Sequence, residues 1–401
     1  MTRSTLFLAS LMLFFPSLLL AASPSVAIDT RWSHLRGVNF FSSDAANAAE
    51  MWRHFDPVRV DRELGWMEQL GFNSVRIWLS EQAWREDPEV FTRSLALALD
   101  LSDKHRLSVL LVLFDSCGIE PRGDAVEMSI GEAYEHFLRS PSLSDQQKQF
   151  TRSRYAEFAK GRGRYILVPV AKDTPPDIIF WQNWTPNPGL RRLGPENWPE
   201  FDAYADAVMK TAVRSTGGIA FDLMNEPSTL MDLPTGVSYT QAKDRVYAFV
   251  AHIATYMHNK YPTAARTIGC SSLEEMKSLA QYQTVLSIHS YLLGDELAKN
   301  LKAAAEIAQQ NSKGLILSEG LANTDDWLKA YGEESISTDE GQLRHYQRTL
   351  PIILHSGIGW YAWGGIAGRM FTPSTDLIYP GGYLRPAAAY LQRELAATPA
   401  Q

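Results

Sequence analysis

Two glutamates that each follow an apolar run could supply acid–base chemistry. Glu226 comes after Phe-Asp-Leu-Met-Asn at 221–225, and Glu319 comes after Leu-Ile-Leu-Ser at 315–318. Cleavage of a glycosidic bond needs two carboxyl groups, because one protonates the leaving oxygen while the other attacks or shields the anomeric carbon. The surroundings must keep the acid protonated near neutral pH and the nucleophile ionised. Asn225, directly before Glu226, is placed to hydrogen-bond the sugar 2-hydroxyl.

Each glutamate taken alone has an ordinary structural explanation. A Glu that follows a strand is usually a solvated loop residue or a charge at a helix N-terminus. Arg76 favours the catalytic explanation over the structural one. It lies inside an apolar run, and a buried guanidinium is costly without a carboxylate. Glu319 is the natural partner for that guanidinium. We therefore expect the arginine and the two glutamates to belong to one site.

Eight short apolar runs must position these residues. They lie at 36–41, 74–79, 107–114, 218–224, 266–270, 285–289, 314–318 and 357–363. Segments with helical periodicity lie between them, at 62–70, 90–104, 201–214, 241–260, 296–310 and 342–355. Eight β-then-α units predict an α/β fold, the (β/α)8 TIM barrel, whose active face is formed by the carboxyl ends of the strands. Glu226 then ends the fourth strand and Glu319 the seventh, on opposite sides of the barrel mouth.

An open doubly wound sheet is the competing fold. That fold typically carries a glycine-rich phosphate-binding turn after an early strand. Neither G-x-G-x-x-G nor G-x-x-x-x-G-K-[ST] occurs in this chain. The barrel also accommodates the roughly one hundred residues between the third and fourth runs, because barrels tolerate long βα loops. We expect an insertion at about 116–216, with helices at 131–138 and 144–158 and an ordered loop at 181–189 that forms a lid or cleft wall.

The chain resembles clan A glycoside hydrolases, and most of all family 5, the cellulase and mannanase family. The likeness spans nearly all of the chain after its N-terminal segment. Its marks, each in or at the end of an expected strand, are Arg36-Gly37-Val38-Asn39, Asn73-Ser74-Val75-Arg76, Asn225-Glu226-Pro227, His289-Ser290-Tyr291, Ser318-Glu319 and Trp360-Tyr361-Ala362-Trp363. A lone Asn-Glu-Pro would be a weak mark, whereas six marks in the correct order are specific.

This resemblance implies a role for each matching residue. Glu226 matches the general acid/base of the family, and Glu319 matches its nucleophile. Arg76 matches an arginine that keeps the nucleophile ionised and oriented, as a nearby cation does for a carboxylate. Tyr291 matches a tyrosine that hydrogen-bonds the nucleophile, and His289 matches a histidine that lines the same pocket.

Aromatic and acidic residues complete the implied site. Trp363 matches the aromatic floor under the sugar at the cleavage point, and Trp360 is a second, less favoured candidate for that role. The chain departs from many family 5 members at the end of the third strand, where they have a histidine and this chain reads Phe-Asp-Ser-Cys at 114–117. Asp115 either makes a sugar contact in its place or only caps the loop.

The first residues have the pattern of an export signal. Arg3 precedes an apolar run at 6–22, and Ser-Val-Ala at 25–27 is a small-x-small cleavage pattern. We expect a signal peptide at 1–27, a single catalytic domain at 28–401, and a secreted or periplasmic protein. A permanent anchor is the alternative, but Pro16 interrupts the run and no strongly basic stop-transfer segment follows.

The composition limits the classes of molecule that the protein is expected to bind. Without residues 1–27 the chain has 37 basic and 45 acidic residues, a net charge of −8, which disfavours nucleic acid. The nine histidines include no H-x-H or H-E-x-x-H pair, and Cys117 and Cys270 lie far apart in sequence, so we expect no metal and no cofactor. Two cysteines can form at most one internal disulfide. We expect a monomer that binds a polysaccharide or oligosaccharide and has no stable membrane insertion after signal cleavage.

Together these features predict a retaining β-glycoside hydrolase that is endo-acting on a β-1,4-linked polysaccharide such as cellulose, β-glucan or mannan. Three alternatives stay open. A barrel that has lost catalysis would still bind sugar, and a transglycosylase would use the same two glutamates. A barrel enzyme of different chemistry, such as a metal-dependent hydrolase, would need an ion.

Overall fold

The computed structural model describes most of the chain. The described residues are 32–118, 126–129, 139, 145, 164–168, 177–179, 185–213, 215, 218–230, 233, 236–322, 338–368, 375–379 and 381–397. The expected signal peptide, the expected helix at 131–138 and nearly all of the expected helix at 144–158 lie outside these residues. These expectations stay predictions.

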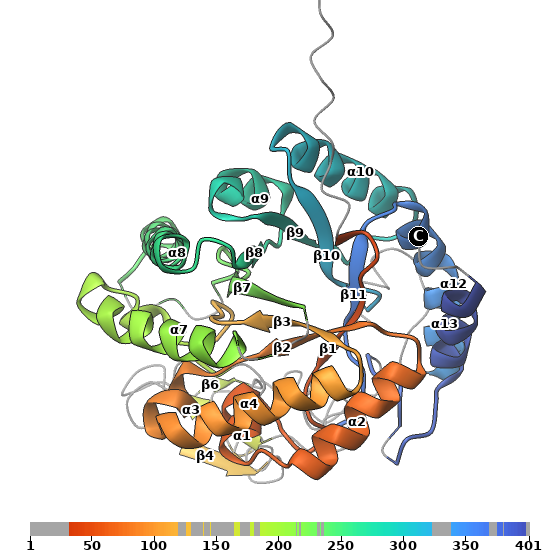
Figure 1. Ribbon diagram of the computed structural model, residues 1–401, viewed down its shortest axis with the longest axis horizontal. Coiled ribbons are helices and arrows are strands. Elements are labelled where there is room, and N and C mark those ends of the chain that lie inside the picture. The colour runs from red at the N-terminus through yellow and green to blue at the C-terminus, as the bar shows by residue number, and fades with distance from the viewer. Residues whose placement is uncertain are drawn as a thin grey trace, which may run out of the picture.

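Eight parallel strands form one sheet, in the order β8-β7-β3-β2-β1-β11-β10-β9 (Figure 1). Their bounds are β1 (Arg36–Phe40), β2 (Ser74–Trp78), β3 (Ser108–Val112), β7 (Ile219–Asn225), β8 (Ala265–Gly269), β9 (Val285–His289), β10 (Gly314–Gly320) and β11 (Gly359–Ala362). Every expected apolar run contains or overlaps one of them. The prediction of eight β-then-α units is therefore confirmed.

The two end strands of this order meet and nearly close the barrel. The Thr284 N–H donates to the Arg266 carbonyl at 2.7 Å, and the His289 N–H donates to the Cys270 carbonyl at 2.7 Å. Cys270 and Ile288 also form an isolated parallel bridge. The fold is thus a (β/α)8 barrel, and the open doubly wound sheet is excluded.

Helices surround the barrel (Figure 1). They are α1 (Ala48–Arg53), α2 (Pro57–Gln69), α3 (Glu81–Glu86), α4 (Pro88–Lys104), α7 (Trp198–Ala212), α8 (Tyr239–Lys260), α9 (Leu273–Leu279), α10 (Gly294–Gln310), α12 (Asp339–His355) and α13 (Pro386–Ala397). Several begin earlier than their apolar periodicity predicted, because capping residues set their starts. Asp56 caps α2 ahead of Pro57, and Ser238 with Gln241 forms a capping box on α8.

The barrel interior has an apolar end and a polar end. Its apolar layer contains Leu35, Leu110, Ala220, Val285, Ile316 and Tyr361. Because side chains alternate along a strand, residues an even number of positions apart face the same interior, and toward the carboxyl ends of the strands several inward-facing residues are buried and polar. These are Asn39, Arg76, Asp222, Thr267, Ser287 and Ser318. The sequence thus places a polar layer at the carboxyl ends of the strands.

The chain between β3 and β7 carries a separate antiparallel sheet. Its strands are β4 (Val126–Ser129), β5 (Arg164–Val168) and β6 (Asp177–Ile179). Asn187 attaches the end of this segment to the barrel, since its Oδ1 accepts the Glu81 N–H at 2.9 Å and its Nδ2 donates to the Leu79 and Leu113 carbonyls. The boundaries predicted for the insertion stay a prediction, and Trp181 and Trp184 of the expected loop are not among the described residues.

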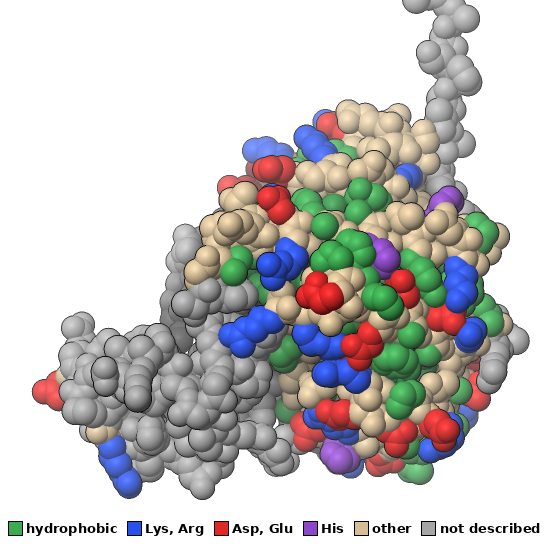
Figure 2. Space-filling model, turned by 90° about the vertical axis from the view of Figure 1, so that its left-hand side faces the viewer, with side chains coloured by type: hydrophobic (Ala, Val, Ile, Leu, Met, Phe, Trp, Pro, Cys, Tyr) green, Lys and Arg blue, Asp and Glu red, His purple; other side chains and the backbone are tan. Residues whose placement is uncertain are grey.

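The surface carries mixed charge. On the face seen in Figure 2, acidic and basic side chains are interspersed and neither sign dominates. Among the described helices, none is both long and apolar enough to cross a bilayer. Cys117 and Cys270 are both buried free thiols, so the one internal disulfide that the sequence allows is not formed.

Candidate active site

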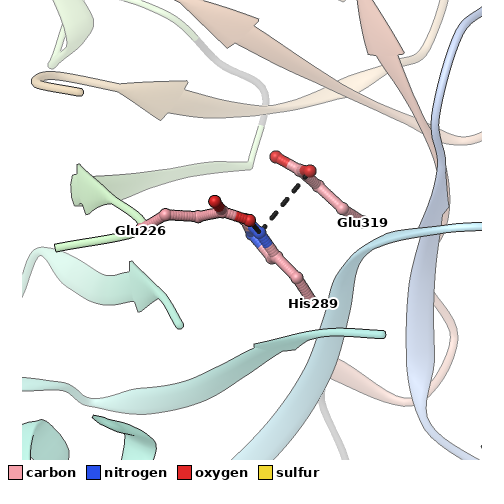
Figure 3. Close-up of side chains that lie close together, drawn as sticks. All are labelled: Glu226, His289 and Glu319. Carbon is pink, nitrogen blue, oxygen red and sulfur yellow. Dashed lines mark hydrogen bonds and ion pairs between the residues drawn. The ribbon is translucent and has the colours of Figure 1, made fainter. Parts of the chain in front are cut away.

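The two predicted glutamates face each other at the polar end of the barrel (Figure 3). Glu226 directly follows β7, and Glu319 lies near the end of β10. Regular alternation would turn Glu319 away from the interior, because Ser318 already faces inward. The pairing register of β10 shifts between Leu317 and Glu319, and this irregularity lets Glu319 turn inward.

Glu226 is held in an unusual backbone conformation. The register of β7 also shifts at its end, between Asp222 and Asn225, and Glu226 has a φ of 44°. A non-glycine residue in this left-handed region costs on the order of 1–3 kcal/mol and persists only where surrounding contacts enforce it. Here the Glu226 N–H donates to the Gly269 carbonyl at 2.7 Å. The strained turn aims the carboxyl group into the barrel mouth.

Arg76 is the buried centre of the site. All five of its N–H donors have acceptors. Nη1 donates to Glu319 Oε1 at 2.5 Å and to Asn39 Oδ1 at 3.1 Å. Nη2 donates to Asp222 Oδ2 and Asn225 Oδ1, each at 2.7 Å, and Nε donates to Asp222 Oδ2 at 3.2 Å. One side chain from β2 thereby fixes residues from β1, β7 and β10.

The charges around Arg76 explain its protonation. Burial alone lowers the pKa of Arg76, but the adjacent Asp222 and Glu319 carboxylates outweigh that effect and raise it. The guanidinium therefore stays charged. A fixed cation in a site of low dielectric stabilises negative charge on Glu319, the residue that would have to attack as an anion.

His289 lies between the two glutamates. Its Nδ1 is 2.7 Å from Glu226 Oε1 and 3.5 Å from Glu319 Oε2 (Figure 3). Burial lowers the pKa of His289, but Glu319 and Glu226 outweigh it, so the net shift is upward. For Glu226, burial raises the pKa and the hydrogen bond from His289 outweighs it, so the net shift is downward. His289 therefore opposes protonation of Glu226, whereas burial favours it.

Three further predicted residues join this network. The Tyr291 hydroxyl donates to Glu319 Oε2 at 2.6 Å, as the resemblance implied. Asn225 Nδ2 donates to Asp115 Oδ1 at 3.1 Å, and the Cys117 N–H donates to the same Asp115 oxygen at 2.9 Å. Asp115 therefore does cap its loop. Whether Asp115 or Asn225 also contacts a sugar stays a prediction.

The two candidate tryptophans occupy different environments. Trp363 is half-buried and meets the Trp78 ring edge-on, with centroids 5.5 Å apart. Trp360 is only 2% exposed and packs against Phe72 in the core outside the barrel. The prediction that Trp360 could form the sugar floor is wrong, because strand alternation turns it away from the interior.

Several residues of the site were not predicted. Asp222 is the second carboxylate on Arg76. From the sequence it was assigned only to an apolar strand, although a charged residue inside such a run indicates a buried ionic partner. The centroid of the Trp78 ring lies 4.2 Å from the Arg76 guanidinium carbon. Gly269 has room only for hydrogen, since a Cβ there would lie 2.8 Å from His289 Nε2 and 3.0 Å from Arg76 Nη2. Nothing in one sequence marks that glycine.

Glu226, His289 and Glu319 are also the described residues that could hold a cation. Each offers one donor atom, and these atoms lie within 4.8 Å of one another. Arg76 argues against such an ion, because its guanidinium already lies 2.5 Å from Glu319 and would repel a second cation there.

Comparison with known proteins supports the fold. No family model and no curated protein sequence matches the chain. Among solved structures, the exo-β-1,4-mannosidase Op5Man5 from Opitutaceae bacterium strain TAV5 is similar, with 15% identity, a TM-score of 0.55 and coverage of 90% of this chain and 59% of that one. A variant of GH5_18 from Streptomyces cattleya, in complex with Manβ1-4GlcNAc, has 12% identity, a TM-score of 0.58 and coverage of 91% and 82%.

A β-glucuronidase 2 from Bacteroides uniformis, covalently bound to a cyclophellitol-6-carboxylate aziridine, is a third neighbour. It has 12% identity, a TM-score of 0.51 and coverage of 90% of this chain and 35% of that one. The chain thus spans about a third of the glucuronidase and somewhat less than two thirds of the Opitutaceae mannosidase. At these identities the likeness establishes the barrel fold.

Replacing Arg76 should destabilise the protein strongly. Arg76→Met leaves Asp222 and Glu319 buried without their cation, so we expect the free energy of unfolding to fall by about 3–5 kcal/mol in urea titrations. Arg53→Met is the matched control, because Arg53 pairs with Glu86 on the surface, and it should cost less than about 1 kcal/mol. A similarly small loss of unfolding free energy in both variants would show that the Arg76 ion pairs do not hold the site together.

Asp115 should make stability depend on pH. Burial raises the pKa of Asp115 to about 6, with hydrogen bonds from Cys117 and Asn225 only partly offsetting it. The folded protein therefore binds this proton more tightly than the unfolded chain, whose Asp titrates near about 3.9. The stability that Asp115 contributes is present below pH about 4 and is lost as the pH rises through about 6.

The isosteric variant Asp115→Asn removes that dependence. Its free energy of unfolding, relative to the unmodified protein, should rise between pH about 4 and about 6 in urea titrations. Asp100→Asn, at an exposed position, is the control and should show a constant difference. A constant difference for Asp115→Asn as well would show that the folded carboxyl titrates like the unfolded one.

Proposed function

We propose that the chain is a retaining β-glycoside hydrolase, endo-acting on a β-1,4-linked polysaccharide such as cellulose, β-glucan or mannan. The observation that carries this proposal is the closeness of Glu226 and Glu319, which each offer one carboxylate oxygen within 4.8 Å of the other. Retaining enzymes hold their two carboxyl groups about 5 Å apart, whereas inverting enzymes need about 6.5–9.5 Å to admit a water. The partners of each carboxyl also differ as the two roles require.

In the first step Glu226 acts as the acid. Its proton passes to the glycosidic oxygen, the bond from that oxygen to the anomeric carbon breaks, and the leaving sugar departs as an alcohol. The Glu319 carboxylate forms the new bond to the anomeric carbon and becomes a glycosyl ester. Arg76 and Tyr291 hold the attacking carboxylate through hydrogen bonds of 2.5 and 2.6 Å, so it does not need to reorient.

In the second step Glu226 acts as the base. It takes a proton from a water molecule, the water oxygen bonds to the anomeric carbon, and the ester bond to Glu319 breaks. Two inversions leave the anomeric configuration unchanged. Glu226 is then protonated again and Glu319 is again a carboxylate.

The protonation of Glu226 is coupled to that of His289. Because the two side chains are 2.7 Å apart and their pKa shifts oppose each other, they titrate as a coupled pair. A substrate that displaces water from the site favours the uncharged form of both groups, with the proton on Glu226 and a neutral His289. His289 thus controls how readily Glu226 is protonated.

An aromatic residue and two similar structures support the proposed class of substrate. Half-buried Trp363 follows β11 and meets Trp78, whose ring lies against Arg76, and such an aromatic ring suits stacking against a sugar. Two similar structures are named for β-1,4-mannosidase activity and for a complex with Manβ1-4GlcNAc, which supports including mannan beside glucan. We also propose export with removal of residues 1–27, on the sequence pattern alone.

The test is a panel of defined β-glucan, mannan and xylan oligosaccharides, with the product anomer followed by NMR. We expect initial release of the β-anomer. Glu319→Gln should lower kcat/KM at least about 10³-fold, since it removes the nucleophile. Glu226→Gln should lower it about 10²–10⁴-fold, since it removes the acid. Glu306→Gln, at an exposed position on α10, is the control and should match the unmodified protein.

Each contrary outcome points to a different alternative. Initial α-anomer excludes retention, and hydrolysis that survives Glu319→Gln excludes the assigned nucleophile. Binding of the oligosaccharides without cleavage identifies a barrel that has lost catalysis. Products longer than the substrate identify transglycosylation. Loss of activity in excess chelator would identify metal-dependent chemistry, whereas we expect full activity.

A further inference from the structure

The chain beyond β3 stays paired with the chain that carries Glu226. The Asn225 N–H donates to the Phe114 carbonyl at 2.8 Å, and the Ser116 N–H donates to the Asn225 carbonyl at 3.2 Å. The Ser116 hydroxyl also donates to the Glu226 carbonyl. These bonds hold the next residue, Cys117, at a fixed place beside the Glu226 side chain.

Contacts on both sides of Cys117 in the chain fix the position of this residue. Its own N–H is held by Asp115 Oδ1 at 2.9 Å. Gly118 follows, and it has no room for a side chain, because a Cβ there would lie 2.7 Å from the Thr185 carbonyl oxygen and from Pro186 Cα. Cys117 is 4% exposed, and its Sγ lies 3.5 Å from Glu226 Oε2.

The two oxygens of Glu226 therefore have different neighbours. Oε1 is bound by His289 Nδ1 at 2.7 Å, whereas Oε2 faces the thiol. Burial, together with Asp115, Glu226 and Glu319, raises the pKa of the Cys117 thiol, so it stays S–H and donates. A thiol is a weak donor compared with an imidazole N–H. Thr229 also hydrogen-bonds the Glu226 carboxylate.

We propose that Cys117 is a positioning residue for the acid/base, and that its S–H contact identifies Oε2 as the oxygen that exchanges the proton with the glycosidic oxygen. This inference rests on the proposed function. The strong bond from His289 keeps the carboxyl group in place throughout both steps. The weak S–H contact orients Oε2 before the substrate binds and gives way when the substrate oxygen arrives.

Two substrate classes separate this role from a merely structural one. Cellohexaose and mannohexaose have leaving groups that need the proton from Glu226. Dinitrophenyl β-cellobioside and dinitrophenyl β-mannobioside have leaving groups that depart without it. A residue that acts through the acid therefore affects kcat/KM for the hexaoses and leaves kcat/KM for the aryl glycosides nearly unchanged.

We expect Cys117→Ala to lower the plateau of kcat/KM for the cleaved hexaose, where Glu226 is protonated, about 3–10-fold through lost positioning, and to change kcat/KM for the aryl glycoside by less than about twofold. Removing a donor from the ionised carboxylate raises the pKa of Glu226, so the basic limb of the pH profile should move to higher pH. Cys117→Ser restores a donor and should return the limb toward its original place. Cys270→Ala is the matched control, because that buried thiol donates to the Ile268 carbonyl instead.

Several outcomes would overturn the inference. An unmoved basic limb in Cys117→Ala would do so, and so would equal losses on both substrate classes or the same shift in Cys270→Ala. Thermal unfolding of each variant shows whether it is folded, and Cys117→Ser keeps the test valid if the alanine variant is not. Failure of the unmodified protein to cleave any substrate would instead refute the proposed function.

Discussion

The buried charge of Arg76 is the constraint on which the rest of the site depends. A guanidinium that is fully enclosed in a barrel must find anions and acceptors for all its donors, or the fold loses several kcal/mol. Arg76 finds them in Asp222 and Glu319, with Asn39 and Asn225 supplying the remaining acceptors. The same contacts that make this charge tolerable fix the position of Glu319. Stability and the geometry of the proposed nucleophile therefore depend on one interaction.

The second carboxyl is positioned by different means, as its different task requires. Glu226 sits on a strained turn, titrates together with His289, and touches the thiol of Cys117. No fixed cation lies in direct contact with it among the described residues, so its charge can change during a reaction. A neighbouring titratable group and weak donors allow that change, whereas the full ion pair on Glu319 would oppose it.

Much of this arrangement could be predicted from the sequence, and the failures have physical reasons. Strands buried on both faces give continuous apolar runs, and the run at 285–289 matches β9 at both ends. Arg76 inside such a run implied a carboxylate partner. Asp222 was missed because Glu319, at a strand end, already supplied a carboxylate partner for Arg76. Bulges that turn Glu319 inward, and the contact that requires Gly269, depend on pairing between distant strands, which a single sequence does not specify.

The central claim is that Glu319, held by Arg76, is the carboxylate that bonds to the sugar. The most direct measurement is mass spectrometry of the protein after incubation with dinitrophenyl 2-deoxy-2-fluoro-β-cellobioside and with its β-mannobioside counterpart, followed by peptide mapping. The fluorine slows both steps, whereas the dinitrophenyl leaving group speeds only the first, so an ester should accumulate. The account predicts one added glycosyl group, located on the peptide that contains Glu319. A label on Glu226 or on any other residue would contradict it.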